Sequence, residues 1–252
     1  MKLRALSALL AGLGVSVLAP RDASAFELGT PAQEHPHRSA QNFYLELKGS
    51  PYSPRVDSEP ALNGRTPFKD AFGDKPRFAF SLEFDWQLYR IPWLGTIGPA
   101  FGFTYVTMSR DALTKTTKQP SADTYGLDIY PLELMAVLRA DTLWLNYGIP
   151  FVPYAKAGMA YAPWRATNAL GTSDSGGAKG KGATLGTNVA FGMQFAFGVF
   201  DRGAARALDN VTGINNTYIF AEYYWLDLNG VAQDTVLYVG THSWAAGLAF
   251  EF

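Results

Sequence analysis

The sequence predicts an all-β fold in which the strands close into one antiparallel barrel, and three observations lead to this prediction. Segments of about ten residues alternate large apolar side chains with small or polar ones, which is typical of strands with one apolar face. Stretches rich in Pro, Gly, Asn and Ser separate these segments. The segments number eight, and an even number lets an antiparallel barrel close with both chain ends on one side.

The start of the chain predicts a cleaved signal peptide. Lys2 and Arg4 precede an apolar run over 6–19, and Ala23-Ser24-Ala25 supplies the small-residue pattern that a signal peptidase reads. We therefore expect an exported protein whose mature chain begins at Phe26. The predicted division of the chain is a signal peptide over 1–25, a flexible periplasmic leader over 26–41 and a β-barrel over 42–252.

The composition excludes several classes of protein. The chain has no cysteine, so it can form neither disulfide bonds nor cysteine-ligated metal sites. Its formal net charge is −1; residues 1–25 contribute +2, which leaves −3 for the remainder and suggests no nucleic-acid partner. Charged residues make up 17% of the chain, below the roughly 25% of an average soluble domain. Beyond the signal peptide no run of 18 apolar residues occurs, so a membrane location would require a closed barrel.

The first half of the chain contains four predicted strands. Residues 42–50 alternate Phe and Leu with polar residues until a proline ends the pattern. Residues 77–88 carry the clearest alternation, with Phe, Leu and Trp on one face, over a length that crosses a bilayer when tilted. Residues 96–108 set Ile, Phe and Tyr against Gly, Ala and Thr. The fourth strand lies within 123–140, where Pro131 predicts a bulge or the start of the strand.

The second half contains the other four. Residues 151–163 set Phe, Met and Tyr against Lys, Gly and Ala, and residues 183–198 set Leu, Val, Phe and Met against Gly, Ala, Asn and Gln. Residues 217–227 are aromatic on both faces, which leaves the orientation of this strand open. Placing Glu222 inside turns Ile219, Ala221, Tyr223 and Trp225 outward. Residues 243–252 complete the count.

Long and short connections alternate along the predicted barrel. The long ones, expected outside the cell, are 51–76, 109–122, 164–182 and 228–240. The others are 89–95, 141–150 and 199–216. We expect 164–182 to be a mobile loop because it is rich in Gly, Ser, Lys and Thr. One or two helical turns are expected within 202–208, and Trp144 and Tyr147 are expected to anchor the chain at the membrane interface.

The face opposite the large apolar residues distinguishes a membrane barrel from a soluble one. A soluble lipocalin-like barrel turns its apolar face inward and its polar face to water. Here the opposite face of the third, sixth and eighth strands is mostly Gly and Ala, which would make a poor solvent coat but can line a crowded interior. We therefore predict a closed antiparallel transmembrane β-barrel whose interior charges pair across the lumen, because isolated charges there are costly. The predicted interior polar network is Glu46, Lys48, Glu83, Asp85, Glu133, Arg139, Lys156, Glu222 and Glu251.

Several segments resemble those of known outer-membrane proteins. Residues 152–161 (VPYAKAGMAY) resemble the Pro-Tyr-x-x-x-Gly-x-x-Tyr strand of small eight-stranded bacterial outer-membrane β-barrels, and residues 247–252 (GLAFEF) resemble their ending. With its strand 218–222 after Gly213-Ile214, the mature chain also resembles uncharacterised outer-membrane β-barrel proteins of myxobacteria. The resemblance implies a barrel in the outer membrane of a Gram-negative bacterium, and it carries over no catalytic residue.

The last strand resembles the C-terminal signal of outer-membrane barrels, because apolar residues occupy alternate positions before a final Phe. The residues of this predicted membrane-insertion signal are Trp244, Leu248, Phe250 and Phe252. The partners expected of such a protein are outer-membrane lipid, lipopolysaccharide and the barrel-assembly machinery.

The sequence gives little support for an enzyme. Barrels that resemble lipid A deacylases place a His and a Ser two positions apart on one strand face, whereas the only such pair, His37 and Ser39, lies in the leader. His242 and Ser243 are adjacent, so they would face opposite sides of a strand. His35 and His37 have no third metal ligand beside them. We therefore expect no catalytic residue, no cofactor and no metal.

Two non-enzymatic functions remain. In the first, the protein has a structural or surface-interaction role, because the interior of an eight-stranded barrel is normally filled by side chains. In the second, it is a narrow, porin-like passage for small or hydrophobic molecules, in which the Gly and Ala residues leave a lumen. The two differ in whether Glu83, Asp85, Arg139 and Lys156 meet in a layer that blocks the bore.

Overall fold

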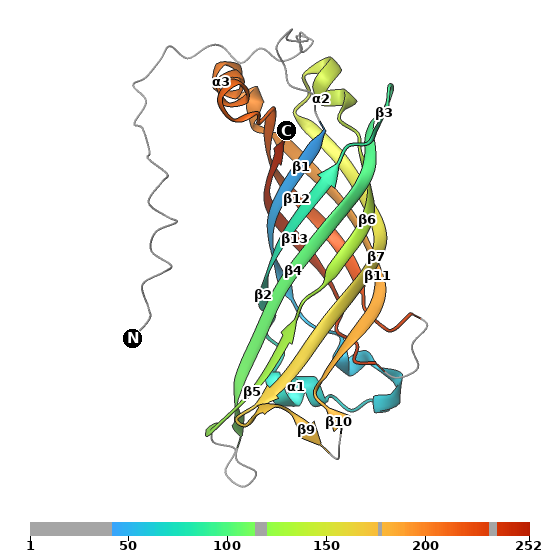
Figure 1. The fold of residues 1–252 in the computed structure, drawn as a ribbon, viewed down its shortest axis with the longest axis vertical. Helices are drawn as coiled ribbons and strands as arrows, with labels where there is room; N and C mark the ends of the chain where they lie inside the picture. The colour runs from blue at the N-terminus through green and yellow to red at the C-terminus, as the bar shows by residue number, and fades with distance from the viewer. Residues whose placement is uncertain (1–41, 114–119, 176–177, 232–235) are drawn as a thin grey trace.

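The computed structural model describes residues 42–113, 120–175, 178–231 and 236–252, which form a closed barrel with short helices at both ends (Figure 1). The barrel strands are β1 (Phe43–Tyr52), β2 (Arg77–Trp86), β4 (Gly95–Leu113), β5 (Pro120–Ile129), β6 (Leu132–Arg139), β7 (Phe151–Asn168), β11 (Lys181–Ala196), β12 (Asn216–Asp227) and β13 (Thr241–Glu251). The short strands are β3 (Tyr89–Ile91), β8 (Gly171–Thr172), β9 (Asp174–Ser175) and β10 (Ala178–Lys179). The helices are η1 (Val56–Ser58), η2 (Pro60–Leu62), α1 (Pro67–Phe72), α2 (Thr142–Tyr147), η3 (Phe197–Val199) and α3 (Arg202–Thr212). The predicted signal peptide and leader lie outside the described residues.

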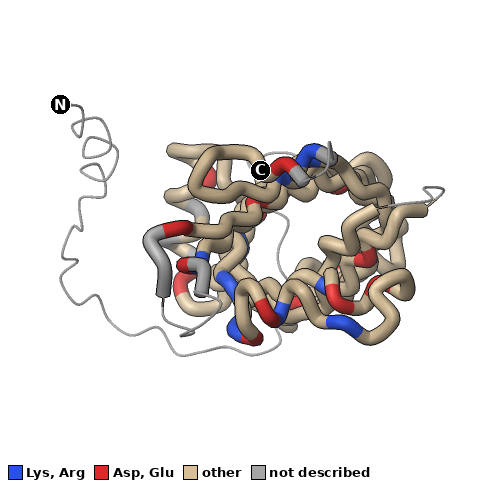
Figure 2. Tube along the Cα trace, turned by 90° about the horizontal axis from the view of Figure 1, so that it is seen from below, with Lys and Arg blue, Asp and Glu red and all other residues tan. Residues whose placement is uncertain are grey.

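The strands close into a ring. Each barrel strand pairs antiparallel with its neighbours in the ring, where β5 and β6 both lie between β4 and β7, and β13 pairs with β1 to complete the circuit. Seen along the barrel axis, the chain encircles a common centre (Figure 2). The start of β1 and the end of β13 lie together, where Asn42 N donates to Phe252 O at 2.7 Å. Because β5 and β6 occupy a single place in the ring, the prediction of a closed, eight-stranded antiparallel barrel is confirmed.

Pro131 explains why β5 and β6 are separate elements. Proline has no N–H to donate to the ladder, so it interrupts a strand at its position. On either side the pairing continues, because Tyr130 N donates to Pro163 O at 2.9 Å and Pro131 O accepts from Thr104 N at 2.8 Å. The two segments therefore act as one strand between β4 and β7.

Two predicted loops are partly wrong, because strands extend into them. β7 continues to Asn168 and β11 begins at Lys181, so much of 164–182 is paired strand rather than mobile loop. β4 and β5 extend in the same way into 109–122. Cross-strand pairing overrides the low strand propensity of the Gly, Ser and Lys residues in these segments.

Short helices cover both ends of the barrel. In α1, Asp57 caps the first turn by accepting from Phe68 N and Lys69 N at 2.8 and 2.9 Å. α3 is 11 residues long, which is longer than the predicted one or two turns. Within the described residues, none of the helices has the length and apolar character needed to cross a membrane.

The prediction for Trp144 is wrong, whereas Tyr147 is exposed. Trp144 of α2 turns toward the barrel, packs in an aromatic cluster and donates from Nε1 to Asn216 Oδ1 at 3.3 Å. Burying the indole ring while its N–H still donates to an acceptor stabilises the fold more than leaving the ring at the surface.

The outer wall of the barrel is apolar over most of its height. In β2, Phe78, Phe80, Leu82, Phe84 and Trp86 all face outward, and each is at least 40% exposed. In β12, Ile219, Tyr223 and Trp225 face outward and Glu222 faces inward, which settles the open orientation of that strand. Among the described long strands of the barrel, the outward charged residues all lie near the end opposite the start of β1 and the end of β13. These are Asp111, Asp128, Arg165, Lys181 and Asp227.

An ion pair holds the connection at the end near the termini. Arg90 of β3 donates from both Nη atoms to the two carboxylate oxygens of Asp141, at 2.8 and 2.9 Å. Asp141 is buried, and this burial raises the pKa of its carboxyl, whereas the Arg90 guanidinium works against the rise.

Replacing Arg90 with Ala is expected to destabilise the barrel in a pH-dependent way. The loss should be about 1 kcal/mol at neutral pH, because Arg90 is partly exposed to solvent. Without Arg90 the pKa of Asp141 rises further in the folded state only. The loss should therefore be absent where Asp141 is protonated in both folded proteins. It should grow as the pH rises from the folded-state pKa of Asp141 beside Arg90 to the higher folded-state pKa without Arg90. Urea titrations across this pH range would measure it, and a pH-independent loss would contradict the assignment.

Candidate functional site: a charged layer inside the barrel

The interior of the barrel contains a compact group of charged side chains, which we name the charged layer. Their strands place them inward because positions of one parity face the same side of a strand. All are almost completely buried, apart from Lys48, whose side chain is 10% exposed. The layer consists of Glu46 and Lys48 of β1, Glu83 and Asp85 of β2, Arg139 of β6, Lys156 of β7 and Glu222 of β12.

Lys156 is the centre of the layer. Its Nζ lies 2.6 Å from both Glu46 Oε2 and Glu83 Oε1 and 3.4 Å from Glu222 Oε2. Lys48 bridges two of the same carboxylates, with Nζ 2.8 Å from Glu83 Oε2 and 2.7 Å from Glu222 Oε1. Each ammonium therefore has several charged acceptors, which is the condition for keeping a buried cation.

Arg139 extends the layer toward the end near the termini. Its Nη2 donates to Glu46 Oε1 at 2.8 Å and also to Asp85 Oδ2. The guanidinium carbon lies 4.0 Å from the centre of the Tyr44 ring, a cation–π contact. With four carboxylates and three cations, the layer carries a formal charge of −1 when all its groups are ionised.

The other two members of the predicted network lie outside the layer. Glu133 accepts from the Asn188 amide and from Thr104 Oγ1 at 3.3 Å. Glu251 accepts from Gln87 Nε2 at 3.0 Å, from Tyr218 at 2.9 Å and from the Asn216 amide. The structure therefore places all nine predicted residues inside the barrel, but it pairs these two with neutral donors rather than with cations.

Neutral side chains complete the layer, and the sequence analysis did not select them. Tyr154 donates from its hydroxyl to Glu222 Oε2 at 2.9 Å, and Gln194 donates from Nε2 to Glu46 Oε1 at 3.3 Å. Tyr154 has the same inward parity as Lys156, and this shared parity could have identified it. The search for charged residues alone excluded it.

Two small residues of the inner face lie against large side chains of neighbouring strands. A Cβ on Gly192 would lie 2.4 Å from the Tyr154 ring and hydroxyl, and a Cβ on Gly102 would lie 3.3 Å from Glu133 Cβ. Large side chains from neighbouring strands thus occupy the space above these glycines. The glycines allow the interior to be crowded, in the way that glycine–aromatic pairs do in designed barrels.

Clusters of buried apolar side chains lie on both sides of the charged layer. On the side of α1, the buried cluster includes Tyr52, Met108, Ile129 and Leu226, and Phe68 and Phe72 of α1 pack against it. At the end where β1 begins and β13 ends, the cluster is aromatic and consists mainly of Tyr44, Trp144, Tyr154, Tyr218 and Phe220. The charged layer therefore has apolar neighbours toward both ends of the barrel.

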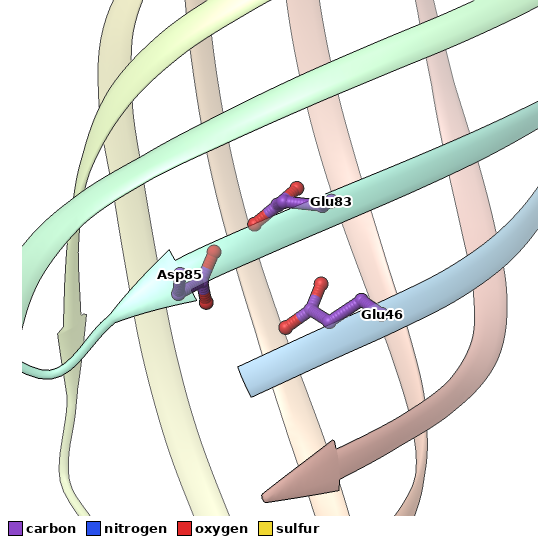
Figure 3. A group of neighbouring side chains, drawn as sticks. All are labelled: Glu46, Glu83 and Asp85. Atoms are coloured by element: carbon purple, nitrogen blue, oxygen red, sulfur yellow. The ribbon is translucent and has the colours of Figure 1, made fainter. Parts of the chain in front are cut away.

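Three carboxylates of the layer could in principle ligate a cation. Oxygen atoms of Glu46, Glu83 and Asp85 all lie within 4.8 Å of one another and face a common space (Figure 3). Lys156 and Arg139 already contact these carboxylates. Their charges balance most of the negative charge that would attract a metal ion, so we assign no metal to this group.

The predicted membrane-insertion residues face outward on β13. Trp244 and Leu248 are exposed, and Phe250 and Phe252 are half-buried. Next to Trp244, His242 contacts Asp227 Oδ1 at 2.7 Å and Arg55 Nη1 at 2.8 Å through Nε2. The imidazole is engaged by a carboxylate and a guanidinium, and the adjacent Ser243 belongs to the other face of the strand.

Comparison with known proteins identifies similar folds only. No protein-family model and no protein with a curated description match the chain. Among solved structures, OprG of Pseudomonas aeruginosa matches with 12% identity and a TM-score of 0.45, covering 85% of this chain and 97% of that one. Ail of Yersinia pestis, solved with the heparin analogue sucrose octasulfate, matches with 12% identity and a TM-score of 0.41, covering 84% and 97%.

The outer-membrane protease OmpT of Escherichia coli also matches, with 8% identity and a TM-score of 0.34, covering 84% of this chain and 94% of that one. An enzyme and other outer-membrane proteins therefore resemble this chain at similarly low levels. The comparisons do not distinguish an enzyme from a non-enzyme.

Proposed function

We propose that this protein is an integral outer-membrane β-barrel protein with a structural or surface-interaction role and a closed interior. The apolar outer wall supports a membrane location, because outward charges in the described long strands of the barrel occur only near one end. The ten-residue β2 also has the length of a tilted transmembrane strand. The start of β1 and the end of β13 would then lie on the periplasmic side, and α1 and the strand extensions would lie outside.

The observation that carries the proposal is the charged layer across the bore. β1 and β7 lie four places apart in either direction around the ring, so they stand on opposite walls. Lys156 of β7 nevertheless contacts Glu46 of β1 directly, at 2.6 Å. Ion pairs across the full diameter, with packed clusters on both sides, support a sealed barrel rather than a narrow passive channel.

The remaining parts of the proposal follow from this location. The protein would be exported by its signal peptide and inserted by the barrel-assembly machinery. Its partners would be outer-membrane lipid and lipopolysaccharide. The role would be non-enzymatic: His242, the one histidine among the described residues, has Ser243 on the other face of its strand and so has no serine nucleophile beside it.

Conductance through planar lipid bilayers would test the sealed barrel. The refolded protein is expected to give no steady openings. A double variant that removes the central cross-lumen contacts, Lys156→Ala with Glu46→Ala, is expected to increase leakage of small ions, provided that gel mobility shows it still folds. A variant at an exposed pair, Lys69→Ala, serves as the control. Steady openings of the unaltered protein would instead support the narrow channel.

A further inference from the structure

Two cations face each other on the outer wall of the barrel. Arg165 of β7 and Lys181 of β11 are directly opposite in the antiparallel register, and both are exposed. Side chains at such positions have Cβ atoms about 5 Å apart, and like charges placed there are destabilising. An additional negative charge at this position would therefore be stabilised by both residues.

The nearby Asp128 of β5 neutralises only part of this charge. Its carboxylate lies 3.2 Å from Arg165 Nη2 and also accepts from Thr107 Oγ1 at 2.6 Å. Within the part of the chain that the structure describes, Lys181 has no carboxylate at salt-bridge distance. Arg165, Lys181 and Asp128 together leave one net positive charge.

A hollow of about 530 Å³ lies beside the two cations on the outer wall. Its lining includes Tyr130, Tyr161 and Ala183 in addition to Arg165 and Lys181, whereas the ring of Trp164 packs against the interior cluster. Tyrosine rings are enriched at the depth of lipid headgroups. From Tyr161 the wall continues toward the middle of the barrel through the exposed Met159 and its apolar neighbours Leu185 and Val189. The hollow thus combines a cationic rim, an aromatic lining and an apolar wall.

We propose that this hollow binds the phosphate of an anionic membrane lipid. Arg165 and Lys181 contact the phosphate oxygens, and the acyl chains lie along the wall of β7 and β11. A guanidinium and an ammonium both bind phosphate strongly, and a lipid also uses the apolar wall, which a free anion would not. The inference rests on the proposed membrane location, in which this end of the barrel faces the outer surface.

Lipid titration of the refolded full chain in detergent micelles, followed by native mass spectrometry, would test the site. Phosphatidic acid is the probe, and phosphatidylcholine with the same acyl chains is the reference. The unaltered protein is expected to prefer phosphatidic acid. Arg165→Gln and Lys181→Gln should each weaken that binding about fivefold. Asp128→Asn should strengthen it, because it removes a carboxylate that competes for Arg165.

Arg55→Gln is the matched control, because Arg55 is also an exposed cation paired with an aspartate. Its substitution should leave the affinity for phosphatidic acid unchanged. Equal weakening by Arg55→Gln, or no weakening by the two variants in the hollow, would overturn the lipid site.

Insertion into phosphatidylcholine vesicles, measured separately by gel mobility, separates the two levels of the proposal. If the chain inserts but its variants do not change lipid affinity as expected, the membrane location stands and the lipid site is contradicted. If the chain fails to insert, both proposals are contradicted.

Discussion

Replacing Lys156 with Met should lower the free energy of unfolding by about 3–5 kcal/mol, because removing one partner of a buried ionic group leaves the other charges uncompensated. Lys156 contacts Glu46, Glu83 and Glu222, so its loss leaves the four buried carboxylates of the layer with two cations instead of three. Met retains most of the length and apolar volume of the Lys stem, which limits the effect of a cavity. Urea titration in lipid vesicles, followed by tryptophan fluorescence, would measure the change.

The control for this experiment is Lys69→Met in α1. Lys69 also forms an ion pair, with Asp74 at 2.9 Å, but both side chains are largely exposed. Exposed pairs contribute little to stability, so no measurable change is expected. Similar behaviour of the two variants would show that the charged layer contributes no more than a surface pair. Combining Lys156→Met with Glu46→Gln and Glu83→Gln should recover part of the loss, because it removes charge from both sides.

Replacing Gly192 with Ala should lower the free energy of unfolding by about 1–3 kcal/mol, the usual range for overpacking a core. The new Cβ would lie 2.4 Å from the Tyr154 ring and hydroxyl and 2.8 Å from Ala221 O. The phenol would have to move, and its hydrogen bond to Glu222 at 2.9 Å would be lost. Gly198→Ala is the control, because the nearest atom to its Cβ would be at an ordinary 3.5 Å.

A double-mutant cycle would show whether the clash with Tyr154 is the cause. Tyr154→Ala removes the ring and is destabilising on its own. In that background Gly192→Ala should lower the free energy of unfolding by about 1 kcal/mol less than it does in the unaltered protein. Of the two close contacts of the new Cβ, only the one with Ala221 O would remain. Additive effects would mean that the backbone contact, not the ring, excludes a side chain at this position.

Alternation of residue types made most of the fold predictable. In β2 and β12 one face meets the interior and the other lies on the outer wall. The alternation of residue types therefore predicts both the strand and the direction of each side chain. The ends of β7 and β11 could not be predicted, because the asparagine, lysine and glycine there have weak strand propensity and only the paired partner strand fixes them. Trp144 was misjudged for a similar reason, since its acceptor Asn216 lies far along the chain.

For the candidate site, the sequence predicted which side chains face inward but not which partners they bind. Parity indicated which charged side chains share the inner face of each strand. It could not indicate that Glu133 and Glu251 would bind neutral donors while Glu46 and Glu83 share Lys156. Those choices depend on the stagger between strands that meet only around the closed ring.

The same ring has a consequence for how the protein enters a membrane. Glu46 and Lys156 are 110 residues apart, and Lys48 and Glu222 are 174 residues apart, so their contacts form only when distant strands of the chain face each other across the bore. Before that moment, half-assembled strands would expose bare charges to hydrocarbon, at a cost of several kcal/mol each. Penetration of the bilayer and closure of the sheet should therefore occur as one concerted event, with a high kinetic barrier set by the long-range contacts.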